Sequence, residues 1–197
     1  SISNQKAKQM YSTFIKGKIF TTKAKTAEII KLSENAFRNI NIAFANELSI
    51  ICDKHNIQYL DVIKLANKHP RVNILQPSIG VGGHCIPVDP YFLIEKYNES
   101  NSLIKTSLKV NNKKNSIVAR KILKVLNKLN LSKKQRILFL GLSYKPNIGD
   151  IRGSPSLKII KYIKTRIKIP ISVNDPYVNN VDNLFEDINS SELLNGI

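Results

Sequence analysis

A glycine-rich loop that carries a cysteine is the segment of this sequence best suited to chemistry. Residues 80–90 have the sequence Gly-Val-Gly-Gly-His-Cys-Ile-Pro-Val-Asp-Pro, which contains Cys85. Glycines let a backbone approach a ligand closely, and a thiol presented just after them can attack an electrophilic carbon. Most free cysteines are small buried hydrophobic residues, and we interpret Cys52, inside a long helical pattern, in that way. The setting of Cys85 favours a nucleophile.

A lysine and an asparagine form a second candidate. Lys31 and Asn35 are four residues apart in a helical pattern and therefore lie on one face. A cation beside an amide donor could bind a negatively charged oxygen. Spacing alone leaves the alternative open, a surface lysine beside a hydrogen-bonded asparagine. His69 and His84 are interpreted as loop residues with backbone partners, because no third ligand accompanies them, and no metal site is predicted.

Helices must position most of these side chains. Residues 26–55 contain neither Gly nor Pro, and their apolar residues recur at helical spacing, which predicts one helix about 45 Å long. Several asparagines interrupt its apolar faces. In a chain of this size such a helix forms a spine or packs against its copy in a dimer. Shorter helical patterns cover 7–15, 60–68, a stretch from 91, and 103–129, and a loop covers 71–90.

The pattern changes near residue 132. We predict a buried strand at 136–142, a helix at 155–168 with Pro in its first turn, and a second strand at 171–173. This order is that of one parallel unit, which cannot complete a sheet, and a further helix is expected at 190–197. The fold class is therefore mixed α and α/β: a long-helix central dimerisation domain followed by an incomplete Rossmann-like parallel α/β domain.

Composition excludes several classes of protein. The 197 residues are 42% hydrophobic, so the chain should bury a core. No apolar run is long enough to span a bilayer and no signal layout opens the sequence, so we expect a soluble cytoplasmic protein without a membrane partner. The formal charge of +17 is a dispersed lysine excess without interleaved aromatics. It favours a solvated surface and an anionic small ligand over nucleic acid.

Five motifs, in this order, resemble those of nucleotide-sugar 6-dehydrogenases, the UDP-glucose/GDP-mannose dehydrogenase family. The resemblance covers essentially the whole chain and is greatest for the branch that acts on UDP-N-acetyl-D-mannosamine. His84 before the cysteine and Val-Asp-Pro after it favour this branch, since UDP-glucose dehydrogenases usually have Ser at position 84. The motifs are Lys-Leu-Ser-Glu-Asn at 31–35, Asn-Glu-Leu at 46–48, Ala-Asn-Lys-His-Pro-Arg-Val-Asn at 66–73, the cysteine segment at 80–90, and the segment 141–155.

The resemblance implies an NAD-dependent, two-step oxidation of the sugar C6 alcohol to a carboxylate. Cys85 would attack the C6 aldehyde to give a thiohemiacetal, and a thioester formed from it would be hydrolysed. Lys31 and Asn35 would stabilise oxyanions, and Asp89 would orient or deprotonate water. Arg71 would reach the substrate of a neighbouring subunit, and Arg152 would lie near the cofactor pyrophosphate. The implied substrate-binding residues are Arg71, Gly82, Gly83, His84 and Lys145.

Proteins of this family begin with a Rossmann domain that carries Gly-x-Gly-x-x-Gly, a motif that this sequence lacks. We interpret residues 1–25 as a remnant of that NAD-binding domain, 26–131 as the central helical dimerisation and catalytic-loop domain, and 132–197 as a truncated UDP-sugar-binding domain. A fragment or the product of a broken reading frame is therefore expected, with the NAD site largely absent and no turnover by itself.

The expected partners are a UDP-N-acetylhexosamine and a second copy of the chain, bound through the Thr26–His55 helix. Two alternatives stay open. The sugar could be the glucosamine epimer, or the chain could be a dimerisation or nucleotide-sugar-binding module without chemistry.

Overall fold

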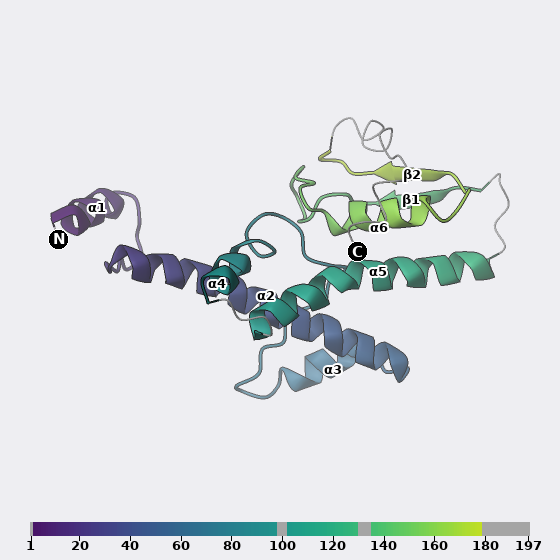
Figure 1. Ribbon diagram of the computed structural model, residues 1–197, viewed down its shortest axis with the longest axis horizontal. Coiled ribbons are helices and arrows are strands. Elements are labelled where there is room, and N and C mark those ends of the chain that lie inside the picture. Colours follow the sequence, from purple (N-terminus) through teal and green to yellow (C-terminus); the bar gives the residue numbers. More distant parts are fainter. Residues whose placement is uncertain (1, 98–101, 130–134, 179–197) are drawn as a thin grey trace.

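The computed structural model describes residues 2–97, 102–129 and 135–178. Six helices and two strands form in these ranges, in the predicted order, and they give the expected mixture of a helical part and an α/β part (Figure 1). The elements are α1 (Ile2–Ser12), α2 (Ala24–Lys54), α3 (Tyr59–Ala66), α4 (Asp89–Tyr97), α5 (Leu103–Lys128), β1 (Ile137–Leu140), α6 (Pro155–Lys164) and β2 (Ile171–Asn174). The helix expected at 190–197 lies outside the described residues.

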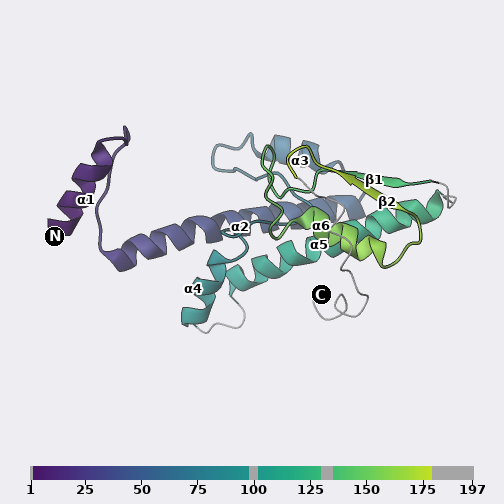
Figure 2. The ribbon, with the colours of Figure 1, turned by 90° about the horizontal axis from the view of Figure 1, so that it is seen from above.

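Helix α2 is the spine of the molecule. It runs for 31 residues, and α5 packs along its second half, whereas its first turns extend beyond α5 (Figures 1 and 2). Helices α3 and α4 also pack on α2. Helix α1, in contrast, stands apart from the rest in both views and has no buried residue. The long helix predicted from the absence of Gly and Pro is thus confirmed.

The buried face of α2 consists of small and polar residues and contains no large apolar side chain. Asparagines that interrupt the apolar pattern in the sequence lie on this face, and Asn39 and Asn46 are fully buried against α5. The large apolar side chains of Phe37 and Phe44 point to solvent, with 67% and 54% of their surface exposed. The apolar spacing therefore identifies the helix correctly but does not identify the face that packs inside the chain.

Strands β1 and β2 pair in parallel, with Ile137 opposite Ile171. Helix α6 connects them and packs, together with the second half of α5, on one face of this small sheet (Figure 1). An apolar core fills this layer, because Ala119, Ile159 and Ile163 are buried there against the ring of Phe139 and several aliphatic side chains. The predicted strand-helix-strand unit is confirmed.

Several helix ends differ from the predicted ones: α1 begins at Ile2 rather than at residue 7, and two C-terminal ends differ for local reasons. Helix α6 ends at Lys164, four residues early, because the hydroxyl of Thr165 and the guanidinium of Arg166 both donate to the carbonyl of Tyr162. Helix α1 ends at Ser12, because the hydroxyls of Ser12 and Thr13 donate to carbonyls of the last turn. Such side chains satisfy the free carbonyls of a helix end and stop its growth.

No helix in the described ranges combines the length and the apolar character needed to cross a bilayer.

Candidate active site

The cysteine loop, residues 78–89, lies between the helical part and the α/β part. Two of its glycines adopt conformations that other residues rarely take, with φ of 145° at Gly80 and 82° at Gly83. A side chain at Gly80 would also overlap the Oδ1 atom of Asn115, and one at Gly82 would come within 2.6 Å of the Cβ atom of Tyr144. The glycines are therefore required by close packing on both sides of the loop.

Cys85 is exposed, whereas Cys52 is buried in α2 with 3% of its surface exposed. The carbonyl oxygen of Cys85 accepts hydrogen bonds from the backbone N–H groups of Val88, at 3.2 Å, and Asp89, at 2.8 Å. These bonds join the cysteine to the first turn of α4. The contrast between the two cysteines agrees with the interpretation of Cys52 as a structural residue.

Asn35 of α2 meets Asp89 at the far end of the loop. The Nδ2 atom of Asn35 donates to the Oδ2 atom of Asp89 at 2.5 Å, and the Asn35 side chain is 4% exposed. Because Asp89 also bonds the carbonyl of Cys85, the structure brings three of the predicted site residues into one connected group.

Lys31 lies one turn before Asn35 on α2. Its ammonium pairs with Glu34 at 3.3 Å, and both side chains are mostly exposed. Within the described part of the chain, Lys31 makes no hydrogen bond to the cysteine loop. Exposed ion pairs of this kind contribute only about 0–1 kcal/mol, so the lysine can exchange Glu34 for a ligand at little cost.

Asp150 and Arg152 form an ion pair in the α/β part, where it adjoins the cysteine loop. The backbone N–H of Gly83 donates to the carbonyl of Arg152 at 3.0 Å. The guanidinium of Arg152 donates three hydrogen bonds to the carboxylate of Asp150, two from Nε at 2.8 and 3.1 Å and one from Nη2 at 2.6 Å. These hydrogen bonds lower the pKa of Asp150 to about 2 and raise the pKa of Arg152, and the charge of nearby His84 acts on Asp150 in the same direction.

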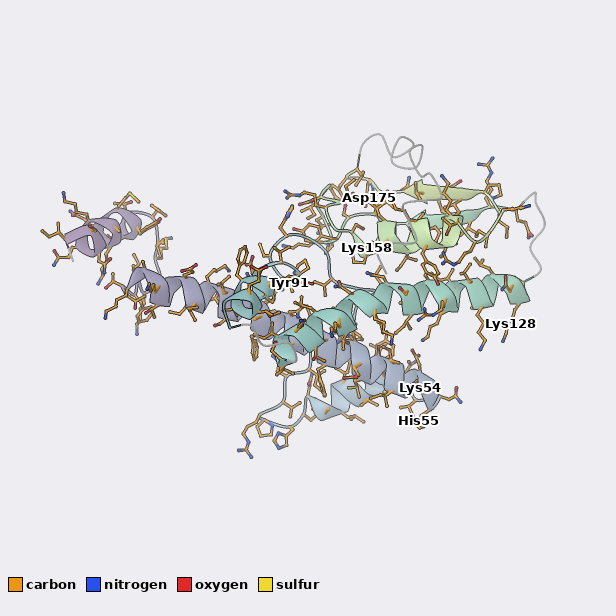
Figure 3. The ribbon with its side chains drawn as sticks, in the orientation of Figure 1. Lys54, His55, Tyr91, Lys128, Lys158 and Asp175 are labelled. Carbon is orange, nitrogen blue, oxygen red and sulfur yellow. The ribbon has the colours of Figure 1, made fainter. Side chains whose placement is uncertain are left out.

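Lys145 borders a hollow of about 270 Å³ at the carboxyl ends of the two strands. Asp175, which follows β2 (labelled in Figure 3), forms one wall of it. Its Oδ2 atom accepts from the backbone N–H groups of Leu142 and Ser143, at 2.8 and 3.0 Å, and from the Ser143 hydroxyl. These bonds, first that from Leu142, lower the pKa of Asp175. Asp175 was not among the predicted site residues. Its place directly after the second predicted strand is the signal that could have identified it.

Arg71 lies away from this group. Its side chain is exposed after α3, and its backbone N–H donates to the Nδ1 atom of His69 at 3.3 Å. Among the described contacts none joins Arg71 to the cysteine loop. The described ranges also contain no group of three or more His, Cys, Asp or Glu side chains that could hold a metal ion.

Sequence reasoning missed a polar network inside the α2–α5 interface. It consists of buried amides and hydroxyls, and the signal was the number of asparagines in a helix, where asparagine is a poor helix former. Buried Lys114 of α5 lies beside it and donates to the Ser49 hydroxyl at 2.5 Å. Burial lowers the pKa of Lys114. We call Asn39, Asn46, Ser107 and Asn111 the amide network.

Comparison with known protein families identifies the family of this chain. Residues 25–113 match the UDP-glucose/GDP-mannose dehydrogenase family, central domain, and residues 138–195 match its UDP binding domain. The chain belongs to the UDP-glucose/GDP-mannose dehydrogenase family. The family resemblance predicted from the five motifs is thus confirmed.

Among curated members of this family, the UDP-N-acetyl-D-mannosamine dehydrogenase of Methanococcus vannielii is 45% identical over 180 residues, which cover 91% of this chain and 42% of the relative. The dehydrogenase of the same name from Campylobacter jejuni is 47% identical and covers 86% of this chain and 41% of the relative. The NDP-N-acetyl-D-galactosaminuronic acid dehydrogenase of Ralstonia solanacearum is 42% identical and covers 98% and 44%.

Solved structures give the same relationship. The UDP-D-ManNAc dehydrogenase of Pyrococcus horikoshii superposes with a TM-score of 0.83 at 40% identity, over 90% of this chain and 43% of that one. The UDP-N-acetyl-mannosamine dehydrogenase of Staphylococcus aureus gives 0.78 at 44% identity, over 88% and 41%. The chain thus spans about two fifths of the length of the relatives it matches.

Proposed function

We propose that this chain acts in the NAD-dependent oxidation of the C6 alcohol of UDP-N-acetyl-D-mannosamine to the uronate, with Cys85 as the nucleophile. The observation that carries the proposal is the contact between Asn35 and Asp89, because the backbone N–H of Asp89 also bonds the carbonyl of exposed Cys85. An exposed thiol, an amide donor and a carboxylate are the groups that formation and hydrolysis of a thioester require. The names of the relatives support the substrate class.

Residues 26–131 would then supply the nucleophile and its helical support, and residues 132–197 would hold the nucleotide. Lys145 beside the hollow and His84, Gly82 and Gly83 of the cysteine loop are proposed to contact the substrate. A lysine suits a diphosphate, because its ammonium offers three donors and a full positive charge.

NAD, when bound, supplies the hydride acceptor for both oxidation steps. Of the described residues, Arg152 suits its pyrophosphate, since its side chain is 64% exposed and Asp150 fixes the plane of the guanidinium. The described segments form no glycine-rich phosphate turn at a helix start, so the residues present fit one phosphate contact and not a whole dinucleotide site.

The thiol would lose its proton to solvent, its Sγ atom would add to the carbon of the C6 aldehyde, and the carbonyl electron pair would move to oxygen. Loss of a hydride from that carbon then leaves a thioester, and water attacks it to release the carboxylate and the thiol. Asp89 would take the proton of the water. An asparagine amide has two N–H donors, so Asn35 can hold Asp89 with one and face the oxyanion with the other. Loss of one such donor typically raises the barrier by about 3 kcal/mol.

Thiol labelling of the chain tests this proposal. We expect Cys85 to react with iodoacetamide faster than buried Cys52, and UDP-N-acetyl-D-mannosamine to slow the reaction at Cys85 alone. UDP-N-acetyl-D-glucosamine and UDP-N-acetyl-D-galactosamine in parallel arms would show which epimer protects best. Equal reactivity of the two thiols without protection would contradict a catalytic Cys85 and favour the non-catalytic module. NADH production by the 197-residue chain alone is not expected, and its detection would refute that expectation.

We further propose that a second copy of the chain packs on α2. Four large apolar side chains on this helix are exposed at intervals of seven residues, the spacing of a helix-helix seam. They are Ile30, Phe37, Phe44 and Ile51, with exposed fractions of 51%, 67%, 54% and 49%.

Sedimentation of variants tests the dimer. Phe37→Glu should convert the dimer to a monomer, because the charge would be buried in the seam. Val125→Glu, at a comparably exposed position of α5, is the matched control and should leave the dimer intact. A Phe37→Glu variant that stays dimeric would rule out this seam.

A further inference from the structure

We propose that Asn46 is a positioning residue for Cys85: its side-chain amide ties the start of the cysteine loop to α2, the helix whose Asn35 holds the other end. The inference rests on the proposed role of Cys85 as nucleophile. It concerns a residue three helical turns away from the predicted catalytic group.

The contact between Asn46 and the loop is direct. The Oδ1 atom of Asn46 accepts from the backbone N–H of Ser78 at 2.8 Å, across 32 residues of sequence. Its Nδ2 atom donates to the Oδ1 atom of Asn111 at 2.9 Å, and Asn46 is fully buried. Loops cannot use regular backbone pairing, so a buried side-chain acceptor is an effective way to fix one.

The rest of the amide network fixes the orientation of Asn46. Asn111 donates through Nδ2 to the backbone carbonyl of Asn39, at 3.0 Å, and to its Oδ1 atom, at 2.8 Å. Asn39 in turn donates to the Ser107 hydroxyl at 2.7 Å. This series of hydrogen bonds is fixed at two backbone groups. The N–H of Ser78 can only donate, and the carbonyl of Asn39 can only accept. Neither Asn46 nor Asn111 can therefore turn its amide over without losing a buried bond.

The two ties to α2 match each other in spacing. Asn35 and Asn46 are eleven residues apart, which is about three turns and about 16 Å along one side of the helix. Ser78 and Asp89, which they bind, are also eleven residues apart, in the opposite direction. The cysteine loop therefore runs antiparallel along α2 and is attached at both ends.

Attachment at one end would not place the thiol. Eleven extended residues reach about 37 Å, more than twice the distance between the two asparagines, so the loop holds a large excess of chain. Near the first tie the excess is folded by Ser78, whose hydroxyl donates to the carbonyl of Gly80 at 2.8 Å, and Asn115 packs against Gly80. A shift of Ser78 would therefore also move the glycines that precede Cys85.

Hydrogen exchange of the chain without ligand tests the role of Asn46. In Asn46→Ala, exchange of peptides from residues 78–86 should accelerate by about tenfold, the effect of one lost net hydrogen bond. Ser107→Ala is the control, because it breaks the far end of the amide network and leaves the bond to Ser78 in place. Its exchange in 78–86 should equal that of the wild type after correction for global stability. Equal acceleration in both variants, or none in Asn46→Ala, would overturn the proposal.

A second variant keeps the test decisive if Asn46→Ala fails to fold. Asn46→Asp retains an acceptor for Ser78 and loses the donor to Asn111, so it should lower stability and yet keep slow exchange at residues 78–80. Rapid exchange there in Asn46→Asp would show that the bond to Ser78 does not fix the loop. Since no ligand is present, this result is independent of whether a UDP-sugar protects Cys85.

Discussion

The interface between α2 and α5 is filled by amides, hydroxyls and an ammonium, whereas the interface between α5 and α6 is filled by aliphatic side chains. One helix contributes to both: α5 supplies Asn111 and Lys114 to the first and Ala119 to the second. Aliphatic contacts are nondirectional and tolerate small shifts, but hydrogen bonds between buried amides hold in one register only. The register between α2 and α5 is therefore fixed by hydrogen bonds at the place where the cysteine loop attaches. The α/β part is stabilised by apolar burial, which does not fix a register.

The largest loss of stability is expected in the apolar interface between α5 and α6. Ile163→Ala removes a fully buried side chain between α5, α6 and the sheet. We expect the free energy of unfolding to fall by about 3 kcal/mol, from lost burial and the remaining cavity. Chemical denaturation followed by circular dichroism measures it, with exposed Lys158→Ala (Figure 3) as the control. A loss below 1 kcal/mol, or faster exchange at residues 78–80 in the folded state, would contradict the separation of the two interfaces.

The polar side predicts a somewhat smaller loss of stability and a larger effect on the loop. Asn111→Ala leaves the Nδ2 atom of Asn46 and the carbonyl of Asn39 without their partner in a buried site. The free energy of unfolding should fall by about 2 kcal/mol, and exchange at Ser78 should rise as well. Asn112→Ala, the exposed neighbour on α5, should change neither. Unchanged exchange at Ser78 would mean that Asn111 does not hold the amide of Asn46 in the orientation that Ser78 needs.

The smallest effect is expected at Asp175, whose carboxylate orders the start of the loop after β1. Asp175→Asn should cost about 1 kcal/mol at pH 7, because an amide cannot accept all the bonds that the carboxylate accepts from Leu142, Ser143 and Tyr177. The pKa of Asp175 is lowered in the folded state, so its stabilisation is present above about pH 4 and is lost as the pH falls through the lowered pKa.

Thermal unfolding between pH 7 and pH 2 measures this contribution. The difference between the wild type and Asp175→Asn should shrink as the solution becomes acidic, whereas exposed Glu28→Gln should show no comparable difference at pH 7. A difference that stays constant down to pH 2 would show that the charge of Asp175 does not stabilise the loop.

Much of the fold could be predicted because its signals are local. The absence of Gly and Pro from residues 26–55 predicted α2, and the change to short apolar runs after residue 132 predicted the parallel unit. Boundaries were less predictable, since α6 ends at a single residue, Thr165, whose hydroxyl takes a helix carbonyl. Apolar periodicity does not predict at which residue such a side chain ends a helix.

The site could be predicted only where residue type alone indicates chemistry. Cys85 stands out in its glycine-rich loop, and Asn35 was named from its spacing to Lys31. Asn46 belongs to the Asn-Glu-Leu motif, but the sequence gives it no role, because its partners Ser78 and Asn111 are 32 and 65 residues away. Apolar periodicity counts asparagine as an interruption of an apolar face, so it does not identify Asn39 and Asn46 as interior residues of α2.

The double attachment of the cysteine loop limits which changes in length the chain can tolerate. A residue inserted or deleted between Ser78 and Asp89 would shift the thiol with respect to Asn35, because neither anchor on α2 can move along a rigid helix. Insertions after α3, in the exposed segment that contains Arg71, would extend the turn that the Asn67 side chain closes onto the backbone of Ile74, and they would not shift the thiol. Natural variation in segment length should therefore accumulate before residue 78 and be absent between the two asparagine contacts.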